Sequence, residues 1–535
     1  MIVPRTVAEI LKDHVTLEVE SIDRMYLNVY VPRLQCEQGV VSFLRFHRGY
    51  PFASSALMDP ITKDFVASIA RFVKEHDIPV VMFQKGQRKE EIAAEHLASF
   101  KAEEGIVFVG KAQEKTAVFR TEKRRNPETG KSYPWIVRST AMVNHYYFYG
   151  LDRDFGPFFI KFCSYFPYNA KLYINGHEYT KRQLTKEGIT YQALDNGFSS
   201  CADLPRLQAI ADQLSAPLID GMLRKWLAYL PHPFTPAGRE AGYRYDISIL
   251  QAEFALTQVL DRPLAGRVFF EEVIRENLDL GRPDHVQLIF ARRVTKRTPG
   301  RFRTRVITEG VTPSLHIDYK RSRIKQYHKE GRALRTETTI NDTRDFAIGK
   351  RLHNLPALRV VGFTANRRLL DVQRVSHDCR VGEDGFRKVT RPIQVEGQRA
   401  SALPFADPRV QALFHALVMF CLLPQGFSNA ELRELLAPLL GLDPSHMTQG
   451  RMSYDLRRLR LHGLIARIPK THRYTLTEEG LRVTLFFDRV YLRILRPGLA
   501  SVLSETPSGD MVLRQSFDRL AAAIDRSVDK AKLAA

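Results

Sequence analysis

The stretch LRRLRLHGLIARIPKTHRYTLTEEG, residues 456–480, decides how the C-terminal part of this chain folds. Its first residues are apolar at helical spacing and continue a helix that is expected to begin near Met447. Two short apolar segments, 464–468 and 473–476, then flank the basic turn Pro469-Lys470-Thr471-His472, and a further helix is expected after Thr477. The stretch therefore predicts a helix, a two-stranded hairpin and another helix in succession.

Two more helices are expected immediately upstream of this stretch. DPRVQALFHALVMFCLLP, residues 407–424, is strongly apolar and predicts a buried helix. In FSNAELRELLAPLLG, Ser428 and Glu431 have the spacing of a capping box, in which each side chain bonds the backbone N–H of the other residue. The chain between residues 407 and 495 is therefore expected to contain three helices, a hairpin and a closing helix.

The helix over residues 447–464 is amphipathic. Met452, Leu456 and Leu459 share an apolar face, and basic side chains with a tyrosine occupy the opposite face. This order of elements resembles the winged helix-turn-helix superfamily over residues 407–495. The resemblance implies that the third helix enters the DNA major groove and that the hairpin contacts phosphates. The DNA-binding residues that it implies are Arg451, Tyr454, Arg457 and Arg458 on the helix, and Lys470, His472 and Arg473 in the wing.

The charge of the whole chain agrees with a polyanionic partner. Among 535 residues, 80 are Lys or Arg and 59 are Asp or Glu, which gives a net charge of +21. Such an excess favours nucleic acid, because neutralised phosphates release counterions. Five scattered cysteines predict neither a disulfide framework nor a zinc cluster. With no apolar stretch of membrane-spanning length and no secretory leader expected, the sequence predicts a cytoplasmic protein that does not enter a membrane.

The sequence predicts a multidomain α/β protein with five regions. In residues 1–140, expected strands at 40–46, 79–83 and 105–110 alternate with expected helices at 62–75 and 90–100, which favours parallel strands. An aromatic-rich β region follows over 141–205, with a turn at 152–154 and a tight hairpin expected at Asn175-Gly176. The remaining regions are helical over 206–282, basic and antiparallel β over 283–395, and a winged helix with C-terminal helices over 405–535.

The basic β region predicts a second nucleic-acid surface. Between residues 292 and 335 there are 14 Lys or Arg residues and three acids. Basic residues that alternate along a strand share one face and can hold a phosphate backbone. The residues expected on this surface are Arg301, Arg303 and Arg305 in RFRTRV, and Lys325 and Lys329, which share a face with Arg323 and Tyr327.

Two patterns in the same region suggest chemistry. Pro283-Asp284, followed by the apolar run HVQLIF and later by Asp318-x-Lys320, resembles the PD-(D/E)xK nuclease pattern. That resemblance implies that Asp284 and Asp318 hold Mg²⁺ and that Lys320 orients the attacking water.

The second pattern is KQYHKEGRALRTE, residues 325–337, which is similar to stretches in plasmid and phage replication initiators. The similarity implies that Tyr327 attacks a phosphodiester, that Arg335 holds phosphate and that Glu337 holds a metal. The chain departs from the most familiar nicking enzymes of that kind, because it lacks their pair of histidines around a hydrophobic residue.

Three functions follow as hypotheses. The first is a DNA-binding protein of replication, recombination or transcriptional control. The second is a metal-dependent DNA nuclease or nickase of a mobile element, for which Mg²⁺ is the only cofactor expected. The third is an adaptor whose winged helix binds protein. DNA is the expected partner in the first two hypotheses, and the sequence is compatible with a homodimer.

Overall fold

The structure is a computed structural model. It describes residues 7–491 except 85, 264, 267–268, 270–300, 310–311, 330–332, 378–380 and 422–424, together with 519, 522–523 and 526. The chain divides into two compact units. The larger contains residues 10–271 and 299–367, and the smaller contains residues 1–9, 272–298 and 368–535. The boundary falls inside helix α11 (Leu355–His377).

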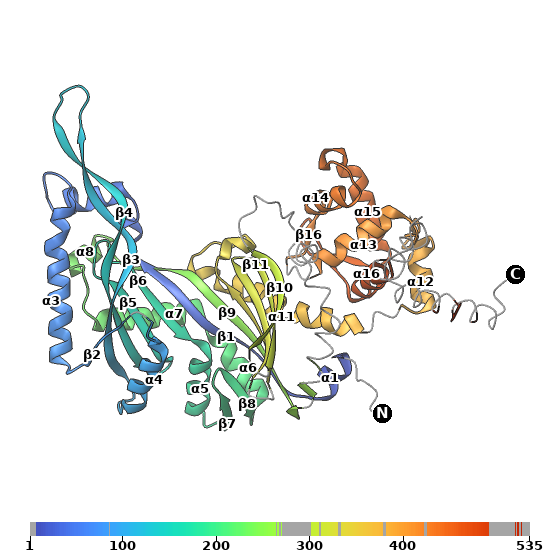
Figure 1. Ribbon diagram of the computed structural model, residues 1–535, viewed down its shortest axis with the longest axis horizontal. Coiled ribbons are helices and arrows are strands. Elements are labelled where there is room, and N and C mark those ends of the chain that lie inside the picture. The colour runs from blue at the N-terminus through green and yellow to red at the C-terminus, as the bar shows by residue number, and fades with distance from the viewer. Residues whose placement is uncertain are drawn as a thin grey trace. The chain divides into compact units, whose positions relative to one another are not determined.

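The larger unit is built on one eleven-stranded sheet (Figure 1). Its strand order is β10-β11-β12-β13-β9-β1-β6-β5-β4-β3-β2, and among its pairings only β2 with β3 is parallel in the described part of the chain. The protein is therefore a mixed α/β protein. The strands are β1 (Val15–Tyr30), β2 (Val80–Met82), β3 (Gly105–Arg125), β4 (Ser132–Asp152), β5 (Gly156–Cys163), β6 (Ala170–Asn175), β9 (Asp246–Leu260), β10 (Arg301–Glu309), β11 (Thr312–Lys320), β12 (Ser322–Lys329) and β13 (Ala333–Ile340).

Apart from the short edge strand β2, the two halves of this sheet have the same strand connectivity among the described residues. In the first half, β1 is followed by the meander β3-β4-β5-β6, whose last strand pairs with β1. In the second half, β9 is followed by the meander β10-β11-β12-β13, whose last strand pairs with β9. Strands β1 and β9 pair antiparallel with each other and join the halves. The first strand of each half therefore lies at the centre of the sheet.

Helices cover both faces of the sheet. On one face, α3 (Asp59–Glu75) packs through Phe65 against Phe162, and Phe363 of α11 packs against Phe254. On the other face lie α4 (Lys89–Ser99), α5 (Gly176–Lys186) and the hairpin of β7 (Tyr191–Leu194) and β8 (Gly197–Cys201). The other α-helices that the structure describes in this unit are α2 (Glu37–Ser42), α6 (Leu204–Gln213), α7 (Ala216–Tyr229) and α8 (Pro236–Glu240). Helix α1 (Val7–Asp13) crosses the boundary between the units after Glu9.

The smaller unit is mainly helical. Its elements are α12 (Glu383–Thr390), β14 (Ile393–Val395), β15 (Gln398–Ala400), α13 (Pro408–Phe420), β16 (Phe427–Ser428), α14 (Asn429–Leu439), α15 (Gln449–Leu461), β17 (Ile465–Arg467), β18 (Arg473–Leu476) and α16 (Glu478–Val490). Strands β16, β18 and β17 form a three-stranded sheet in that order. The apolar faces of α13, α14, α15 and α16 meet in one core.

The capping box predicted at the start of α14 is confirmed. The Ser428 hydroxyl accepts from the Glu431 N–H at 3.3 Å, and Glu431 Oε2 accepts from the Ser428 N–H at 2.7 Å. Both bonds satisfy backbone groups that a helix start leaves without partners.

Several elements predicted for the larger unit are confirmed and four are wrong. The region predicted as β over 283–395 contains the long helix α11. The helices near 62–75 and 90–100 and the strands near 79–83 and 105–110 are present. The segment 40–46 is helical instead of extended, because a short apolar run does not distinguish a strand from a buried helix. Asn175-Gly176 begins α5 instead of a hairpin, since the Asn175 side chain caps that helix. Residues 246–260, predicted as helix, form β9.

Among the described residues, no helix combines the length and the apolar character needed to cross a lipid bilayer.

Candidate functional site

Three acidic residues meet on one face of the sheet at its centre. Asp23 lies on β1, Glu253 on β9 and Glu337 on β13, and these strands are neighbours in the order β13-β9-β1. Their carboxylate oxygens lie within 4.8 Å of one another. We call Asp23, Glu253 and Glu337 the carboxylate cluster. Like charges this close repel strongly, so the cluster needs neutralising groups around it.

A β-bulge places Asp23 in the cluster. The pairing of β1 with β9 shifts register between Ile22 and Met25, so that Asp23 and Arg24 on β1 together lie opposite the single residue Glu253 on β9. Ser21 pairs with Ala255, and Asp23 and Glu253 each lie two positions further along their antiparallel strands. Bulges re-aim side chains and occur often beside active sites. Here the bulge keeps Ile22 and Met25 in the core, where both are buried.

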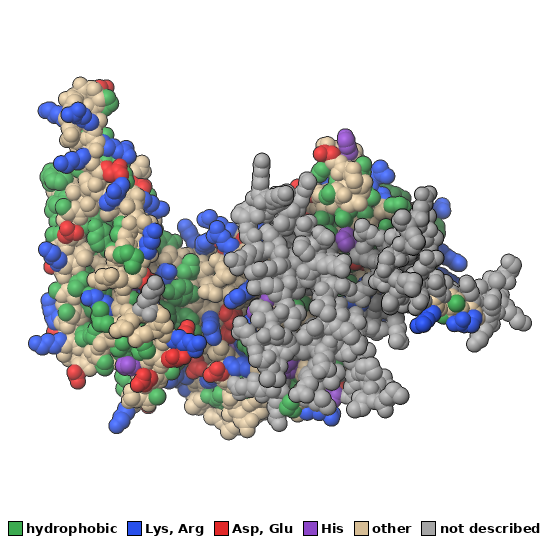
Figure 2. Space-filling model, viewed as in Figure 1, with side chains coloured by type: hydrophobic (Ala, Val, Ile, Leu, Met, Phe, Trp, Pro, Cys, Tyr) green, Lys and Arg blue, Asp and Glu red, His purple; other side chains and the backbone are tan. Residues whose placement is uncertain are grey.

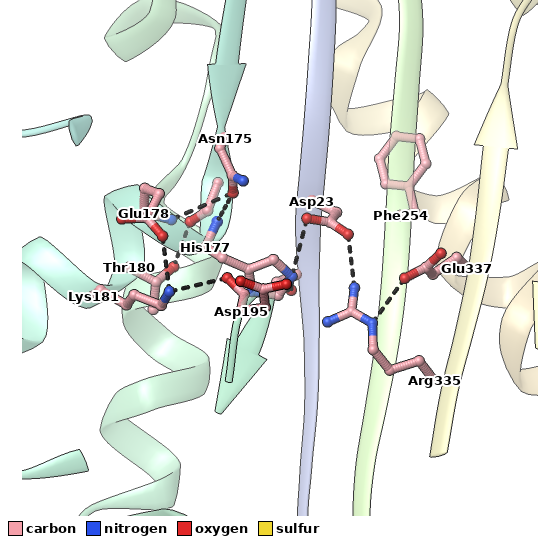
Figure 3. A network of polar contacts seen from close by, with 12 residues as sticks. Asp23, Asn175, His177, Glu178, Thr180, Lys181, Asp195, Phe254, Arg335 and Glu337 are labelled. Carbon is pink, nitrogen blue, oxygen red and sulfur yellow. Dashed lines mark hydrogen bonds and ion pairs between the residues drawn. The ribbon is translucent and has the colours of Figure 1, made fainter. Parts of the chain in front are cut away.

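Arg335 of β13 holds two members of the cluster (Figure 3). Its Nη2 donates to Asp23 Oδ2 at 2.7 Å, and its Nε donates to Glu337 Oε1 at 2.8 Å. The side chains of Arg335 and Asp23 are fully buried. Nη1 of Arg335 has no hydrogen-bond partner among the residues that the structure describes. An unpartnered buried donor is unusual in folded proteins and often marks a functional site.

His177 approaches Asp23 from the helix above the sheet. Asn175 accepts hydrogen bonds from the backbone N–H groups of His177 and Glu178 at 2.9 and 3.4 Å, which fixes the start of α5. His177 Nε2 then lies 3.4 Å from Asp23 Oδ1. Burial and the nearby Arg335 charge lower the pKa of His177 well below its usual value. The imidazole is therefore neutral at physiological pH, and in its Nε2–H tautomer it can donate to the Asp23 carboxylate.

Glu253 carries a proton near neutral pH. Burial and repulsion from Asp23 and Glu337 raise its pKa to about 8, although Arg24 opposes the shift. A cation bound by the three carboxylates would favour the charged form and expel this proton. The cluster has the oxygen ligands that Mg²⁺ and Mn²⁺ prefer.

Tyr327 completes the site from β12. Its hydroxyl donates to Glu337 Oε1 at 2.8 Å, and the Lys325 ammonium lies 4.2 Å from the centre of its ring. Tyr327 pairs with Arg335 and Lys325 pairs with Glu337 across the two strands, so all four side chains share one sheet face. Burial and the negative charge of Glu337 raise the pKa of the Tyr327 hydroxyl.

The structure thus brings together Tyr327, Arg335 and Glu337, the three residues that the replication-initiator pattern singled out. Sequence reasoning missed Asp23, Glu253 and His177. One signal was available for Glu253, which is the only charged residue in the mostly apolar run LQAEFAL, whereas Asp23 stands among other polar residues in VESIDRMYL. Nothing in the sequence placed these runs next to each other.

The structure does not bring the described residues of the PD-(D/E)xK pattern to the carboxylate cluster. Asp284 lies outside the described residues. Asp318 is buried on β11, opposite Arg323 in the register of β11 with β12. The Lys320 ammonium lies 4.0 Å from Asp345 Oδ1. In the strand order, β12 and β13 separate Asp318 from Glu253, which corresponds to ~14 Å at the usual strand spacing. Asp318 is therefore not part of the carboxylate cluster.

The basic residues of the sheet have several environments. Arg301, Arg303 and Arg305 alternate along β10, as predicted, and of these residues the structure describes only the backbone. Lys325 is half-buried beside Tyr327. Lys329 is mostly buried and lies 3.4 Å from Asp195 Oδ2.

In the smaller unit, two residues predicted to contact DNA are engaged within the unit itself. Arg458 is buried, donates to the Ala402 carbonyl and pairs with Asp455. The prediction that Arg458 lies on the exposed face is wrong, because the segment after β15 packs against this part of α15. Arg473 donates to the Gln425 and Gly426 carbonyls and pairs with Glu431 at 2.9 Å, so it ties β18 to the start of α14.

The other predicted DNA-binding residues of this unit are more accessible. Arg451, Lys470 and His472 are exposed. Tyr454 is 48% exposed, and its hydroxyl lies 2.8 Å from the Ser401 hydroxyl. Arg457 is half-buried and donates to the Arg399 carbonyl at 3.2 Å. Of the residues predicted to contact DNA in this unit, the exposed basic ones therefore lie at the start of α15 and in the β17–β18 turn.

No protein family, no curated protein and no solved structure matches this chain.

Proposed function

We propose that this protein binds DNA and cleaves a phosphodiester bond with the help of a divalent cation held by Asp23, Glu253 and Glu337. One observation carries the proposal. Three carboxylates from three neighbouring strands lie within 4.8 Å of one another, beside a tyrosine hydroxyl that donates to one of them at 2.8 Å. A cation there would stabilise the charge that develops on the phosphoryl oxygens during cleavage.

Arg335 is a positioning residue in this proposal. Its guanidinium spans Asp23 and Glu337 and fixes the distance between two ligand carboxylates. It also balances part of the negative charge that would otherwise prevent both from ionising in a buried site. His177 holds Asp23 from the opposite side.

Tyr327 is the proposed nucleophile. Its oxygen would attack phosphorus, the bond from phosphorus to the departing sugar oxygen would break, and the tyrosine proton would pass to Glu337. The departing sugar oxygen takes up a proton from solvent, and the DNA strand remains joined to Tyr327 as a phosphodiester. The bond from the Tyr327 hydroxyl to Glu337 Oε1 supports this direction of proton transfer.

The smaller unit is the proposed duplex-binding module. The order α13, β16, α14, α15, β17, β18, α16, with β18 in the middle of its small sheet, supports the winged-helix resemblance. The exposed Arg451, Lys470 and His472 support contact with phosphates through the start of α15 and the β17–β18 turn.

A nicking assay tests the proposed reaction. The protein is incubated with supercoiled plasmid and Mg²⁺ or Mn²⁺, and Glu253→Gln is compared with Glu187→Gln, an exposed glutamate that pairs with Arg206. The first change imitates the protonated form of Glu253, so folding is preserved while a cation ligand is lost. We expect nicked circles from the wild type and from Glu187→Gln, and at least a hundredfold slower nicking by Glu253→Gln. Equal rates for both variants would exclude the carboxylate cluster from the reaction.

The role of Tyr327 is tested separately. After nicking, denaturing gels should show a labelled strand attached to wild-type protein and none attached to Tyr327→Phe. Nicking without any attached strand would indicate hydrolysis by water at the same cluster and would remove Tyr327 as nucleophile. Absence of both nicking and duplex binding would favour the protein-adaptor hypothesis.

A further inference from the structure

The outer part of the β3–β4 hairpin is a two-stranded ribbon that extends past the neighbouring strands (Figure 1). Residues 105–125 pair with residues 132–151 along almost the whole length of both strands. In the described part of the chain, β2 pairs with β3 only up to Lys111, and β5 pairs with β4 only from His145 onward. The residues between these points belong to β3 and β4 alone.

The ribbon is anchored at its base and closed by an ordered turn. Phe119 and Ile136 are buried, and the Ser55 N–H donates to the Thr121 hydroxyl at 2.7 Å. At the far end, Asn126 Oδ1 accepts from the Glu128 and Thr129 N–H groups at 2.8 and 3.2 Å. We call residues 122–135 the ribbon tip. Contacts hold the backbone of the ribbon tip at both ends, so the positions of its side chains are well defined.

The ribbon tip is basic on both faces. Arg124, Tyr133 and Trp135 share one face, because Arg124 pairs with Tyr133 and Trp135 lies two residues further along β4. Lys123 and Arg125 project from the other face. All four basic side chains, Lys123, Arg124, Arg125 and Lys131, are exposed. Figure 2 shows Lys and Arg side chains gathered on this projection.

Two acids lie in the ribbon tip beside its four basic residues, which leaves it a net charge of +2. Glu122 already pairs with Arg120 at 2.7 Å, and Glu128 lies in the closing turn. Two large aromatic side chains are exposed beside the positive charges, Tyr133 at 40% and Trp135 at 45%. The Arg124 guanidinium lies 4.8 Å from the centre of the Trp135 ring. Exposed aromatic rings next to arginines are typical of surfaces that bind a partner.

We propose that the ribbon tip inserts into the major groove of duplex DNA. The major groove, about 12 Å wide, accommodates a two-stranded β-ribbon. With basic side chains on both faces, such a ribbon can reach the phosphates on both sides of the groove, while Tyr133 and Trp135 contact sugars and base edges. This inference rests on the proposed function, since it assigns a second contact with the same DNA.

Salt-dependent binding to a labelled duplex tests this insertion. The variant Lys123→Ala/Arg124→Ala/Arg125→Ala is compared with Lys63→Ala/Arg71→Ala/Lys74→Ala, which removes three exposed charges from α3. Both variants have the same net charge, so a general charge effect weakens both equally. Near 0.1 M salt, we expect the ribbon variant to bind the duplex at least tenfold more weakly than the α3 variant does. The slope of log K against log salt should fall by about three, whereas the α3 variant keeps the wild-type slope.

Tryptophan fluorescence gives a second measurement. The chain has two tryptophans, and Trp226 is buried, so acrylamide quenching reports on Trp135. We expect a duplex to shield Trp135 from acrylamide, and Trp135→Phe to remove the signal. Shielding by a single strand equal to that by a duplex would overturn the groove assignment.

The outcomes separate the two proposals. If the wild type binds duplex and the ribbon variant binds as tightly as the α3 variant, this inference fails and the proposed function stands. If the wild type binds no DNA at any salt concentration, the proposed function fails together with this inference.

Discussion

Gly197 of β8 lies directly against the guanidinium of Arg335. A β-carbon at residue 197 would be only 2.9 Å from Arg335 Nη1, and the backbone φ of Gly197 is +144°, a conformation that favours glycine. The β7–β8 hairpin therefore sets the position of the arginine that spans the carboxylate cluster. Gly197 thus contributes to the site through its backbone, which contacts the buried Arg335 guanidinium.

Gly197→Ala should therefore impair the reaction without removing a polar group. The new methyl group would displace Arg335 from Asp23 and Glu337, and we expect nicking to slow at least tenfold. The strained φ should also lower the free energy of unfolding by ~1–2 kcal/mol. Thermal unfolding and the plasmid assay measure the two effects. The matched control is Gly188→Ala, a glycine at positive φ with open space around its α-carbon, which should lose stability and keep the wild-type rate.

Cation binding should depend on pH through Glu253. Its pKa of about 8 in the folded protein means that cation binding at pH 7 releases a proton, so apparent affinity should rise with pH and level off above about 8. Calorimetry of Mn²⁺ binding in buffers of different ionisation enthalpy measures the released proton. Glu253→Gln should bind Mn²⁺ more weakly and release none. A pH-independent affinity in the wild type would contradict the proposed ligand role of Glu253.

Glu253 should also affect stability in the absence of a cation. Its pKa is raised from 4.5 on folding, so between pH 4.5 and 8 the folded state binds more protons than the unfolded state. Stability from this group is therefore greatest below pH 4.5 and declines as pH rises towards 8. We expect Glu253→Gln, which cannot ionise, to unfold at a higher temperature than the wild type at pH 8 and to show a smaller difference at pH 5. Thermal unfolding at the two pH values checks this.

The basic residues of α15 and of the β17–β18 turn should separate into a stabilising class and a DNA-binding class. Arg458→Ala removes the guanidinium that donates to the Ala402 carbonyl and pairs with Asp455. Because Arg458 and Asp455 are both buried, we expect a loss of ~3 kcal/mol in the free energy of unfolding. Arg451→Ala/Lys470→Ala removes only exposed charges and should leave stability within about 0.5 kcal/mol of the wild type. Duplex affinity should fall for the double variant when measured by fluorescence anisotropy. Unchanged affinity would exclude the start of α15 and the β17–β18 turn from the proposed DNA contact.

The parts of the site that lie close in sequence could be predicted. Tyr327, Arg335 and Glu337 belong to one hairpin, and the alternation of side chains along paired strands places them on the same face. The capping box of α14 was equally local, since Ser428 and Glu431 are three residues apart.

The rest of the site depends on contacts between distant segments. Asp23 and Arg335 are 312 residues apart, and only the central pairing of β1 with β9 brings them within reach of each other. Residues 246–260 were predicted as helix because that strand is covered on both faces, which hides the alternation of apolar and polar residues. With β9 misassigned, Glu253 could not be placed beside Glu337. The burial of Arg458 was missed for a similar reason, since Ala402, which accepts its hydrogen bond, lies between the predicted regions 283–395 and 405–535.

The shared connectivity of the two half-sheets has a consequence for dividing the chain. The first half supplies Asp23 and His177, and the second supplies Glu253, Tyr327, Arg335 and Glu337. A polypeptide cut in the exposed turn around Ala241-Gly242 would therefore yield two fragments that each lack essential groups. The proposed reaction would require the fragments to reassociate through β1 and β9. The central strand pair that joins the halves therefore also brings together the groups of the proposed site.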